Sequence, residues 1–270
     1  GRAGPLLVSG AVFRWGLLGA GAIARRFGAS IAHAPGHTVG AVASRTPARA
    51  QGLSEALGGG ARTTDYAGLV SDPEVDAVYV ATPAALHVEH VGLALEAGKP
   101  VLCEKPMATR GEDARSMASL ARERGVFCME AMWTRFVPAV RRARALVESE
   151  ALGDLCAFSA ELGYPVVYDP KSRFFDPALG GGALLDAGVY PLSLARFFLG
   201  PVVEAQALVH RAPSGVDETV VAQLRHATGA LSSLTCSLAQ RLSNAATLTG
   251  TQGSLTLEAP LYSPTRLVLA

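Results

Sequence analysis

Residues 12–33 read VFRWGLLGAGAIARRFGASIAH, and this stretch decides the fold. Its first seven residues predict a strand, the glycines that follow predict a tight turn, and residues 22–33 predict a helix. The turn fits the pattern G-x-G-x-x-[G/A], in which the first glycine permits the turn, the second lets the backbone approach a pyrophosphate, and a small third residue allows close packing. We therefore expect the turn and helix N-terminus to bind a dinucleotide through Gly19, Gly21, Ala22 and Ile23, with Ala24 as the packing residue. The alternative is an ordinary strand-to-helix turn.

Strands and helices alternate up to about residue 132. The sequence predicts strands at 12–18, 38–43, 76–81, 101–104 and 126–129, and helices at 22–33, 48–57, 65–70, 86–97 and 110–124. This alternation is typical of a doubly wound parallel sheet.

The pattern changes beyond that point. A helix at 136–149, a strand at 154–162 and a helix from Gly180-Gly181-Gly182 to about residue 198 precede strand-like runs at 202–210, 216–226, 229–238 and 244–258, the last broken near Gly250. Consecutive strands without long helices predict an antiparallel or mixed sheet. We therefore predict an α/β protein with a Rossmann domain at 11–132 and an α+β domain with a large, mostly antiparallel sheet at 133–270.

The end of the second predicted strand indicates which dinucleotide binds. An enzyme that uses NAD usually carries Asp or Glu there to bind the ribose 2′-hydroxyl. This chain has Ser44-Arg45-Thr46, with Arg49 one turn later, and hydroxyl and guanidinium groups bind a 2′-phosphate well. NADP is therefore preferred over NAD. Alternatively, both arginines are solvated residues at the start of a helix.

Lys105 lies in the run VLCEKP at residues 101–106, where an apolar strand ends with a carboxylate and an amine. Open α/β sheets place their chemistry at the carboxyl ends of strands. The ammonium can bind a substrate hydroxyl or lower the pKa of a neighbouring acid, and Glu104 can orient it or contact the nicotinamide. Thr82-Pro83 ends another central strand and is expected near the nicotinamide. The alternative for Lys105 is a surface lysine beside a loop proline.

Tyr190 lies four positions after Asp186 in an apolar helical segment, so the two side chains share one face of the helix. Tyr190 can exchange a proton with a substrate hydroxyl, helped by Lys105, and Asp186 can hold another hydroxyl. Trp133 and Phe136 can form an apolar substrate wall or belong to the core. Without the lysine, a structural acid and a core tyrosine would be the simpler interpretation.

The composition excludes several classes of function. The net charge of +1 gives no reason to expect nucleic acid or an acidic membrane as a partner, and we see no apolar run of the roughly 18–20 residues that span a membrane. The cysteines are far apart, which indicates free thiols in a reducing, cytoplasmic setting. His87 and His90 lack further ligands nearby, so no metal is expected. Residues 1–11, without an initiator Met, are expected to be a frayed extension or an expression remnant.

Several motifs occur together in one order along the chain: the glycine turn, Ala81-Thr82-Pro83, AGKPVLCEKP at residues 97–106 and GGALLD at residues 181–186. This ordered set resembles the Gfo/Idh/MocA oxidoreductase family. The resemblance implies a two-domain nicotinamide-dependent enzyme with the lysine of EKP in its active site.

Four further segments resemble one branch of that family, the dimeric dihydrodiol dehydrogenases and NADP-dependent D-xylose dehydrogenases; they are MEAMWTRF at 129–136, D-x-G-x-Y at 186–190, GVDET at 215–219 and LSNAA at 242–246. Many relatives outside the branch have His where this chain has Tyr190. The branch implies a catalytic pair of Lys105 and Tyr190, a substrate-pocket role for Trp133, and NADP bound through Ser44, Arg45 and Arg49.

The sequence thus predicts hydride transfer between NADP and a sugar or cyclic trans-diol, with a keto-sugar reductase or a non-catalytic NADP-sensing regulator as alternatives. A small polyol is the expected substrate, and a homodimer through the second-domain sheet is the expected assembly. Relatives usually extend roughly 50–60 residues further, in keeping with ordinary domain lengths, so we expect a second domain that is shortened at its C-terminus.

Overall fold

A computed structural model describes residues 12–270 of the chain, and the expectations for residues 1–11, including a domain that starts at residue 11, fall outside it. The chain divides into two compact units. The first ends at Ala131 and the second begins at Met132.

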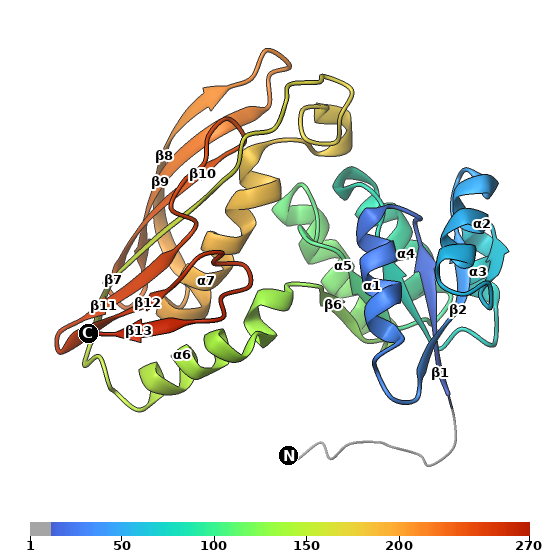
Figure 1. Cartoon of the computed structure of the whole chain (residues 1–270), viewed down its shortest axis with the longest axis horizontal. Helices are drawn as coiled ribbons and strands as arrows, with labels where there is room; N and C mark the ends of the chain where they lie inside the picture. The colour runs from blue at the N-terminus through green and yellow to red at the C-terminus, as the bar shows by residue number, and fades with distance from the viewer. Residues whose placement is uncertain (1–11) are drawn as a thin grey trace. The chain divides into compact units, whose positions relative to one another are not determined.

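The first unit contains a six-stranded sheet in the order β3-β2-β1-β4-β5-β6, and all its neighbouring strands are parallel. Figure 1 labels β1, β2 and β6 of this sheet. The strands are β1 (Phe13–Leu18), β2 (His37–Ala43), β3 (Arg62–Thr64), β4 (Ala77–Val80), β5 (Val101–Cys103) and β6 (Cys128–Glu130). The strand order reverses between β1 and β4. Ligands of open α/β sheets bind at this point, outside the carboxyl ends of the strands.

Helices cover both faces of this sheet. They are α1 (Ala22–Ile31), α2 (Pro47–Ala56), α3 (Tyr66–Ser71), the 3-10 turn η1 (Ala84–Leu86), α4 (His87–Glu96) and α5 (Gly111–Arg124). α1 and α2 pack against Leu17, Val42 and Tyr79, whereas α3, α4 and α5 pack against residues such as Leu18 and Val80. Because adjacent residues point to opposite faces, both faces of β1 and β4 are apolar, and these strands therefore read as continuous apolar runs.

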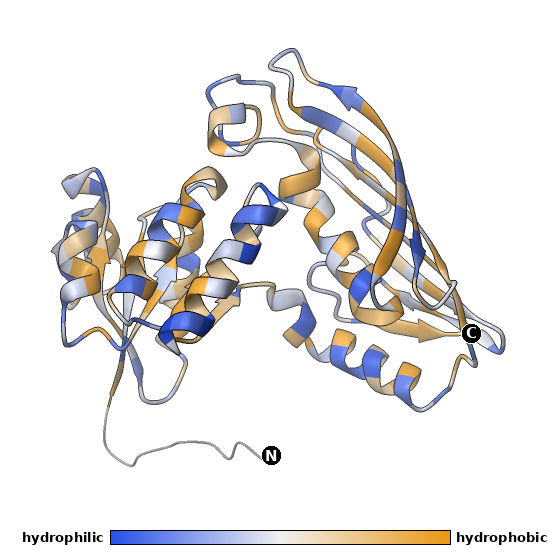
Figure 2. Ribbon diagram, turned by 180° about the vertical axis from the view of Figure 1, so that it is seen from behind, coloured by the Kyte–Doolittle hydropathy of each residue, from blue (hydrophilic) through white to orange (hydrophobic). Residues whose placement is uncertain are grey.

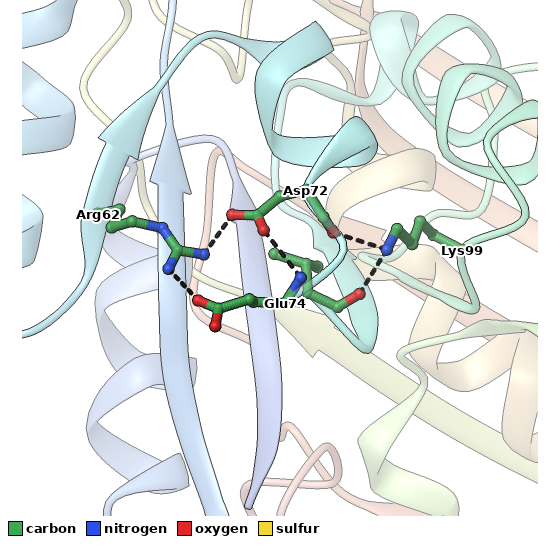
Figure 3. Close-up of polar contacts among 5 residues, drawn as sticks. Arg62, Asp72, Glu74 and Lys99 are labelled. Atoms are coloured by element: carbon green, nitrogen blue, oxygen red, sulfur yellow. Dashed lines mark hydrogen bonds and ion pairs between the residues drawn. The ribbon is translucent and has the colours of Figure 1, made fainter.

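A charged network joins the edge strand β3 to the segment between α3 and β4 (Figure 3). Arg62 forms ion pairs with Asp72 and Glu74, and Lys99 Nζ donates to the carbonyl oxygens of Asp72 (2.8 Å) and Val75 (2.7 Å). The backbone N–H of Glu74 donates to Asp72 Oδ1 at 2.9 Å. This hydrogen bond is the main reason that the pKa of Asp72 lies below its usual value, and Arg62 lowers the pKa further. The network fixes the short edge strand.

Replacing Asp72 by Asn is expected to lower the free energy of unfolding at pH 7 by at most about 1 kcal/mol, because its ion-pair partner Arg62 is half exposed and water screens the pair. The pKa of Asp72 is lowered in the folded state, so its contribution is complete above the unfolded pKa of about 4 and is lost as the pH falls through the folded pKa. Urea unfolding of both proteins at neutral pH and near pH 3 measures this. A difference of the same size at both pH values would assign the effect to packing instead of charge.

The second unit contains a seven-stranded sheet in the order β13-β12-β11-β7-β10-β9-β8. Its strands are β7 (Leu155–Gly163), β8 (Val202–Arg211), β9 (Asp217–His226), β10 (Leu231–Ser237), β11 (Ala246–Gly250), β12 (Gly253–Leu257) and β13 (Leu267–Leu269). β7 and β10 are parallel, and the other neighbouring pairs are antiparallel. The predicted fold class, a Rossmann sheet followed by a large and mostly antiparallel sheet, is confirmed.

The helical elements of this unit are the 3-10 helices η2 (Trp133–Phe136) and η3 (Pro177–Leu179), the π-helical turn η4 (Leu184–Gly188), α6 (Pro138–Glu148) and α7 (Val189–Leu199). α7 packs on β7 and β10, and α6 packs on β12. Their apolar side chains bury Phe158, Leu194 and Leu248 in one core, and hydrophobic residues are frequent in these elements (Figure 2).

The opposite face of this sheet exposes several apolar side chains. Leu208 of β8 is 80% exposed and pairs across the strands with Val221 of β9, which is 42% exposed; Leu231 of β10 is 50% exposed. Between them lie short polar side chains such as Ser233 and Thr235. This face is therefore flat and only partly polar.

One expectation from the sequence needs correction. The helical segment Pro177–Leu199 is long and apolar enough to cross a membrane by length and composition, with a mean hydropathy of 1.2. The sequence shows no apolar run here because polar residues such as Ser193 and Arg196 interrupt it. Half of the most apolar 18-residue stretch is buried within the protein, and Gly180 and Gly182 interrupt the helix with positive φ angles. Packing of α7 in the core of the second unit accounts for its apolar composition.

Candidate functional site

The turn between β1 and α1 fits the pyrophosphate of a dinucleotide. Gly19 has a φ angle of +113°, and a Cβ atom there would lie 2.7 Å from the carbonyl oxygen of Ala81. Apart from Gly21 itself and its chain neighbours, no heavy atom of residues 12–270 lies within 4 Å of a Cβ built on Gly21, the N-cap residue of α1. The space beside the helix N-terminus is therefore open among these residues. The first turn of α1, which starts with the exposed Ala22 and Ile23, has no acidic residue to compete with a phosphate.

A hydroxyl and two guanidinium groups gather after β2. Ser44 follows the strand, and its Oγ accepts the N–H of Thr46 at 3.3 Å. Arg45 and Arg49 are exposed, and the first turn of α2 has no acidic residue. Hydrogen-bond donors and positive charge therefore occupy the position where an NAD-binding enzyme usually has a carboxylate.

The turn after β5 carries Glu104 and the half-buried Lys105. The Glu104 N–H donates to the carbonyl oxygen of Val80 at 2.9 Å, which continues the pairing of β5 with β4. The carboxylate of Glu104 accepts the hydroxyl of Tyr79 and, through Oε2, the N–H of Lys105 at 3.0 Å. Glu104 thus fixes the backbone at Lys105, and its role in orienting the lysine side chain stays a prediction.

Two buried histidines of α4 support the neighbouring turn at Thr82-Pro83. His90 Nδ1 lies 2.9 Å from Thr82 Oγ1, and burial lowers the pKa of His90, which favours the neutral ring. His87 lies within hydrogen-bond distance of backbone carbonyl oxygens, not of other metal-ligating side chains. Among residues 12–270 there is no group of three or more His, Cys, Asp or Glu side chains suited to a metal ion.

In the second unit, Tyr190 lies in the first turn of α7 beside two aromatic side chains. Trp133 Nε1 donates to Tyr190 Oη at 3.4 Å, and the ring of Tyr262 lies 6.1 Å from that of Trp133 and 5.7 Å from that of Tyr190. An N–H directed at the phenol oxygen stabilises negative charge there. Trp133 therefore contacts the reactive atom of the predicted catalytic tyrosine.

The carboxylate of Asp186 binds two side chains from the segment after β7. Its Oδ1 lies 2.8 Å from Arg173 Nη1, and its Oδ2 accepts the hydroxyl of Tyr164. The pKa of Tyr164 is strongly raised, first by burial and then by the negative charge of Asp186, so Tyr164 stays protonated and donates to Asp186. Asp186 is thus one member of a network with Arg173 and Tyr164.

The π-helical turn that carries Asp186 differs from the regular helix that the sequence predicts. Asp217, at the start of β9, caps this turn, because its Oδ2 accepts the N–H of Leu184 at 2.6 Å. Gly182 has a φ angle of +125°, and a Cβ atom there would collide with the Asp217 carboxylate. π-helical turns often occur at functional sites.

The predicted site residues therefore form two groups. Those of the first unit follow the carboxyl ends of β1, β2, β4 and β5, and those of the second unit, Trp133, Asp186 and Tyr190, lie in η2, η4 and α7. The sequence analysis missed the supporting residues Tyr79, Glu130, Tyr164, Arg173 and Tyr262. Each of them contacts a predicted residue or its turn from a distant position in the chain, which no local pattern reveals.

Two family models match the chain. The model described as "Oxidoreductase family, NAD-binding Rossmann fold" matches residues 13–132, and the "GFO/IDH/MocA C-terminal domain" matches residues 140–256.

The chain is also similar to individual proteins. It is 38% identical to the trans-1,2-dihydrobenzene-1,2-diol dehydrogenase of Sus scrofa over 260 residues, which is 95% of this chain and 77% of that protein. It resembles the crystal structure of a 3-ketoreductase from Actinomadura kijaniata in complex with NADP and TDP-benzene (TM-score 0.85, 30% identity, 96% of this chain and 84% of that chain). A levoglucosan dehydrogenase in complex with NADH and L-sorbose is similar as well (TM-score 0.89, 26% identity, 96% of this chain and 76% of that chain).

The family matches cover both units, and they agree with the dinucleotide geometry of the β1–α1 turn. The protein is an oxidoreductase with a domain that binds a nicotinamide cofactor, and it belongs to the Gfo/Idh/MocA family.

Proposed function

We propose that the protein is a dehydrogenase that transfers hydride from a hydroxyl-bearing carbon of a sugar or cyclic trans-diol to NADP⁺. One observation carries this proposal: the Lys105 turn and the glycine turn of β1 follow strands of one parallel sheet, separated only by β4, and open at the same carboxyl edge. A cationic side chain is thus available beside a dinucleotide site, where a substrate hydroxyl loses its proton.

Each residue has a role that follows from its surroundings. The β1–α1 turn holds the pyrophosphate, and Thr82-Pro83 and Glu104 border the nicotinamide end. In the oxidative direction Tyr190, as the phenolate, accepts the proton of the substrate hydroxyl at Oη and becomes the neutral phenol. Lys105 and the Trp133 indole N–H stabilise that phenolate before the transfer. Asp186, held by Arg173 and Tyr164, accepts a second substrate hydroxyl. The bound nicotinamide supplies the hydride acceptor.

Absorbance at the nicotinamide band tests the function directly. Wild-type protein is mixed with NADP⁺ or NAD⁺ and a panel that includes D-xylose, other aldoses, inositols and a trans-dihydrodiol. Turnover with NADP⁺ on a member of the panel supports the proposal. NADP⁺ binding without turnover on any member contradicts it and favours a non-catalytic regulator.

The reverse direction has support of its own, because one structural relative is a 3-ketoreductase. In that case the same residues act in reverse, and Tyr190 donates the proton to a keto-sugar. Faster turnover of NADPH with keto-sugars than of NADP⁺ with the polyols would favour a physiological reductase.

For the cofactor we propose NADP over NAD, supported by Ser44, Arg45 and Arg49 after β2. Replacing Arg45 by Ala is expected to lower kcat/KM for NADP⁺ by about 10- to 100-fold, because a charge-assisted hydrogen bond to the 2′-phosphate is lost. The value for NAD⁺ should hardly change, and Arg49→Ala in parallel shows how the two arginines share the phosphate. Equal losses with both cofactors would contradict a 2′-phosphate contact.

We also propose a homodimer through the exposed face of the second sheet. The flat surface around Leu208 and Val221 supports this, because a second copy would cover both side chains. Leu208→Asp is expected to raise the dimer dissociation constant at least about 10-fold, because it buries a charge at the interface. Light scattering during size-exclusion chromatography measures this. A wild-type protein that is monomeric at micromolar concentrations would contradict the dimer.

A further inference from the structure

His87 connects two turns that the proposed function places at the cofactor. It is the first residue of α4, and only 1% of its surface is exposed. Its Nε2 lies 2.9 Å from the carbonyl oxygen of Thr82, after β4, and its Nδ1 lies 2.8 Å from the carbonyl oxygen of Pro106, after β5. The imidazole ring therefore spans the gap between the Thr82-Pro83 turn and the Lys105 turn.

Both contacts of His87 require the imidazole ring to act as a hydrogen-bond donor. A carbonyl oxygen only accepts, so each contact needs a proton on the ring nitrogen. A neutral imidazole carries one N–H and donates to one of the two carbonyls, whereas the doubly protonated ring donates to both. An apolar residue of similar size would fill the same space but could donate a hydrogen bond to neither carbonyl oxygen.

The Lys105 turn is held on its other sides as well. Before Lys105, the carboxylate of Glu104 binds the hydroxyl of Tyr79 and the N–H of Lys105. After Pro106, the N–H of Met107 donates to Glu130 Oε1 at 2.8 Å. These contacts come from β4 and β6, and His87 adds a contact from α4. The backbone on both sides of the lysine is thus fixed by side chains from neighbouring elements.

We propose that His87 is a positioning residue for the reaction. By bridging the carbonyl oxygens of Thr82 and Pro106, it fixes the position of the Lys105 backbone relative to the Thr82-Pro83 turn. The proposal rests on the role of Lys105 in the proposed function. A displacement of about 1 Å in a reacting group can cost on the order of 100-fold in rate. Loss of the bridge is therefore expected to act on kcat more than on cofactor binding.

Three substitutions separate positioning from filling of the core. In His87→Asn the amide nitrogen can take the place of Nδ1 and keep the contact with Pro106, and in His87→Gln it can take the place of Nε2 and keep the contact with Thr82. His87→Leu fills the space without a donor. Ser54→Ala is the matched control, because Ser54 is equally buried and donates to the carbonyl oxygen of Ala61 at 2.6 Å, away from both turns.

Positioning predicts that His87→Leu lowers kcat by about 10- to 100-fold, that the affinity for NADP⁺ changes less, and that the Asn and Gln variants lie between Leu and wild type. Filling of the core predicts the opposite order, with Leu the best tolerated. A His87→Leu variant with wild-type kcat would overturn the proposal. So would losses of kcat that parallel the losses of thermal stability in all three variants. If the Leu variant does not fold, the Asn and Gln variants decide by the same two criteria.

Hydrogen exchange of the native proteins supplies a readout that does not depend on activity. The amide hydrogens of residues 103–105, 107 and 108 should exchange faster in His87→Leu than in wild type. Their exchange rates should be unchanged in Ser54→Ala. Unchanged exchange in the Leu variant overturns the bridge. An inactive wild-type protein, or an active Lys105→Met variant, would instead overturn the proposed function and leave the exchange result to decide the bridge.

Discussion

Lys105→Met is expected to lower kcat for polyol oxidation by about 1,000-fold while NADP⁺ binds with nearly unchanged affinity. Methionine keeps the length and packing of the side chain but removes the positive charge that stabilises the developing oxyanion. The glycine turn that is proposed to hold the pyrophosphate is not altered, because it follows β1 and not β5. Steady-state kinetics and a fluorescence titration with NADP⁺ separate the two effects.

A matched control is available for this lysine. Lys99 precedes β5, and its Nζ binds the carbonyl oxygens of Asp72 and Val75 in the charged network. Lys99→Met is expected to lower stability and leave kcat near the wild-type value. Full turnover in Lys105→Met would show that the lysine has no part in the chemistry.

Tyr190→Phe removes one hydroxyl and is expected to lower kcat by about 100- to 10,000-fold. The phenol oxygen is the proposed proton acceptor, and the N–H of Trp133 donates to it at 3.4 Å. Phenylalanine keeps the ring and its packing against Tyr262. The affinity for NADP⁺ should not change, because the substitution keeps the ring and removes only the proposed proton acceptor.

The pH profile makes this prediction sharper. In the oxidative direction wild-type kcat should rise with pH as the proton acceptor is freed, and the residual activity of Tyr190→Phe should lose that dependence. Tyr168→Phe, at an exposed tyrosine that packs on Phe175, is the control. A Tyr190→Phe variant with wild-type kcat and pH profile would assign the proton transfer to another group.

The sequence was sufficient to predict the elements that are buried on both faces. β1 and β4 read as apolar runs, and the helices between the parallel strands were located to within a few residues. The edge strands β3 and β13 were missed; β3 (Arg62–Thr64) contains no apolar residue, so no apolar run marks it. β6 was predicted at 126–129 and lies at Cys128–Glu130, a shift that leaves it paired with β5.

The candidate site was predictable where local chemistry defines it. The glycine turn and the segment VLCEKP that contains Lys105 are uninterrupted stretches of sequence, so each motif can be recognised from the residues that form it. Partners from distant positions were not predictable: Trp133 and Tyr190 are 57 residues apart, and Tyr164 and Asp186 are 22 apart. The π-helical turn was not predicted for a similar reason: the residue that caps it, Asp217, lies far along the chain at the start of β9. These contacts depend on tertiary packing, which one sequence does not display.

The cap of the π-helical turn by Asp217 has a consequence for how this enzyme type can diversify. The segment 164–181 is anchored at one end by β7 and at the other by Gly182 against Asp217. Because Asp217 fixes Leu184 to β9, exposed residues of this segment can change while Tyr190 keeps its place. The fixed part of the segment includes Phe175, which is buried in the core, and the backbone of Phe174, whose carbonyl oxygen accepts the N–H of Gly182. Arg173 and Tyr164, which contact Asp186, belong to the exchangeable part. In the proposed mechanism, substrate range can thus evolve, or be engineered, by changing the exposed residues of one segment while the proposed proton acceptor stays constant.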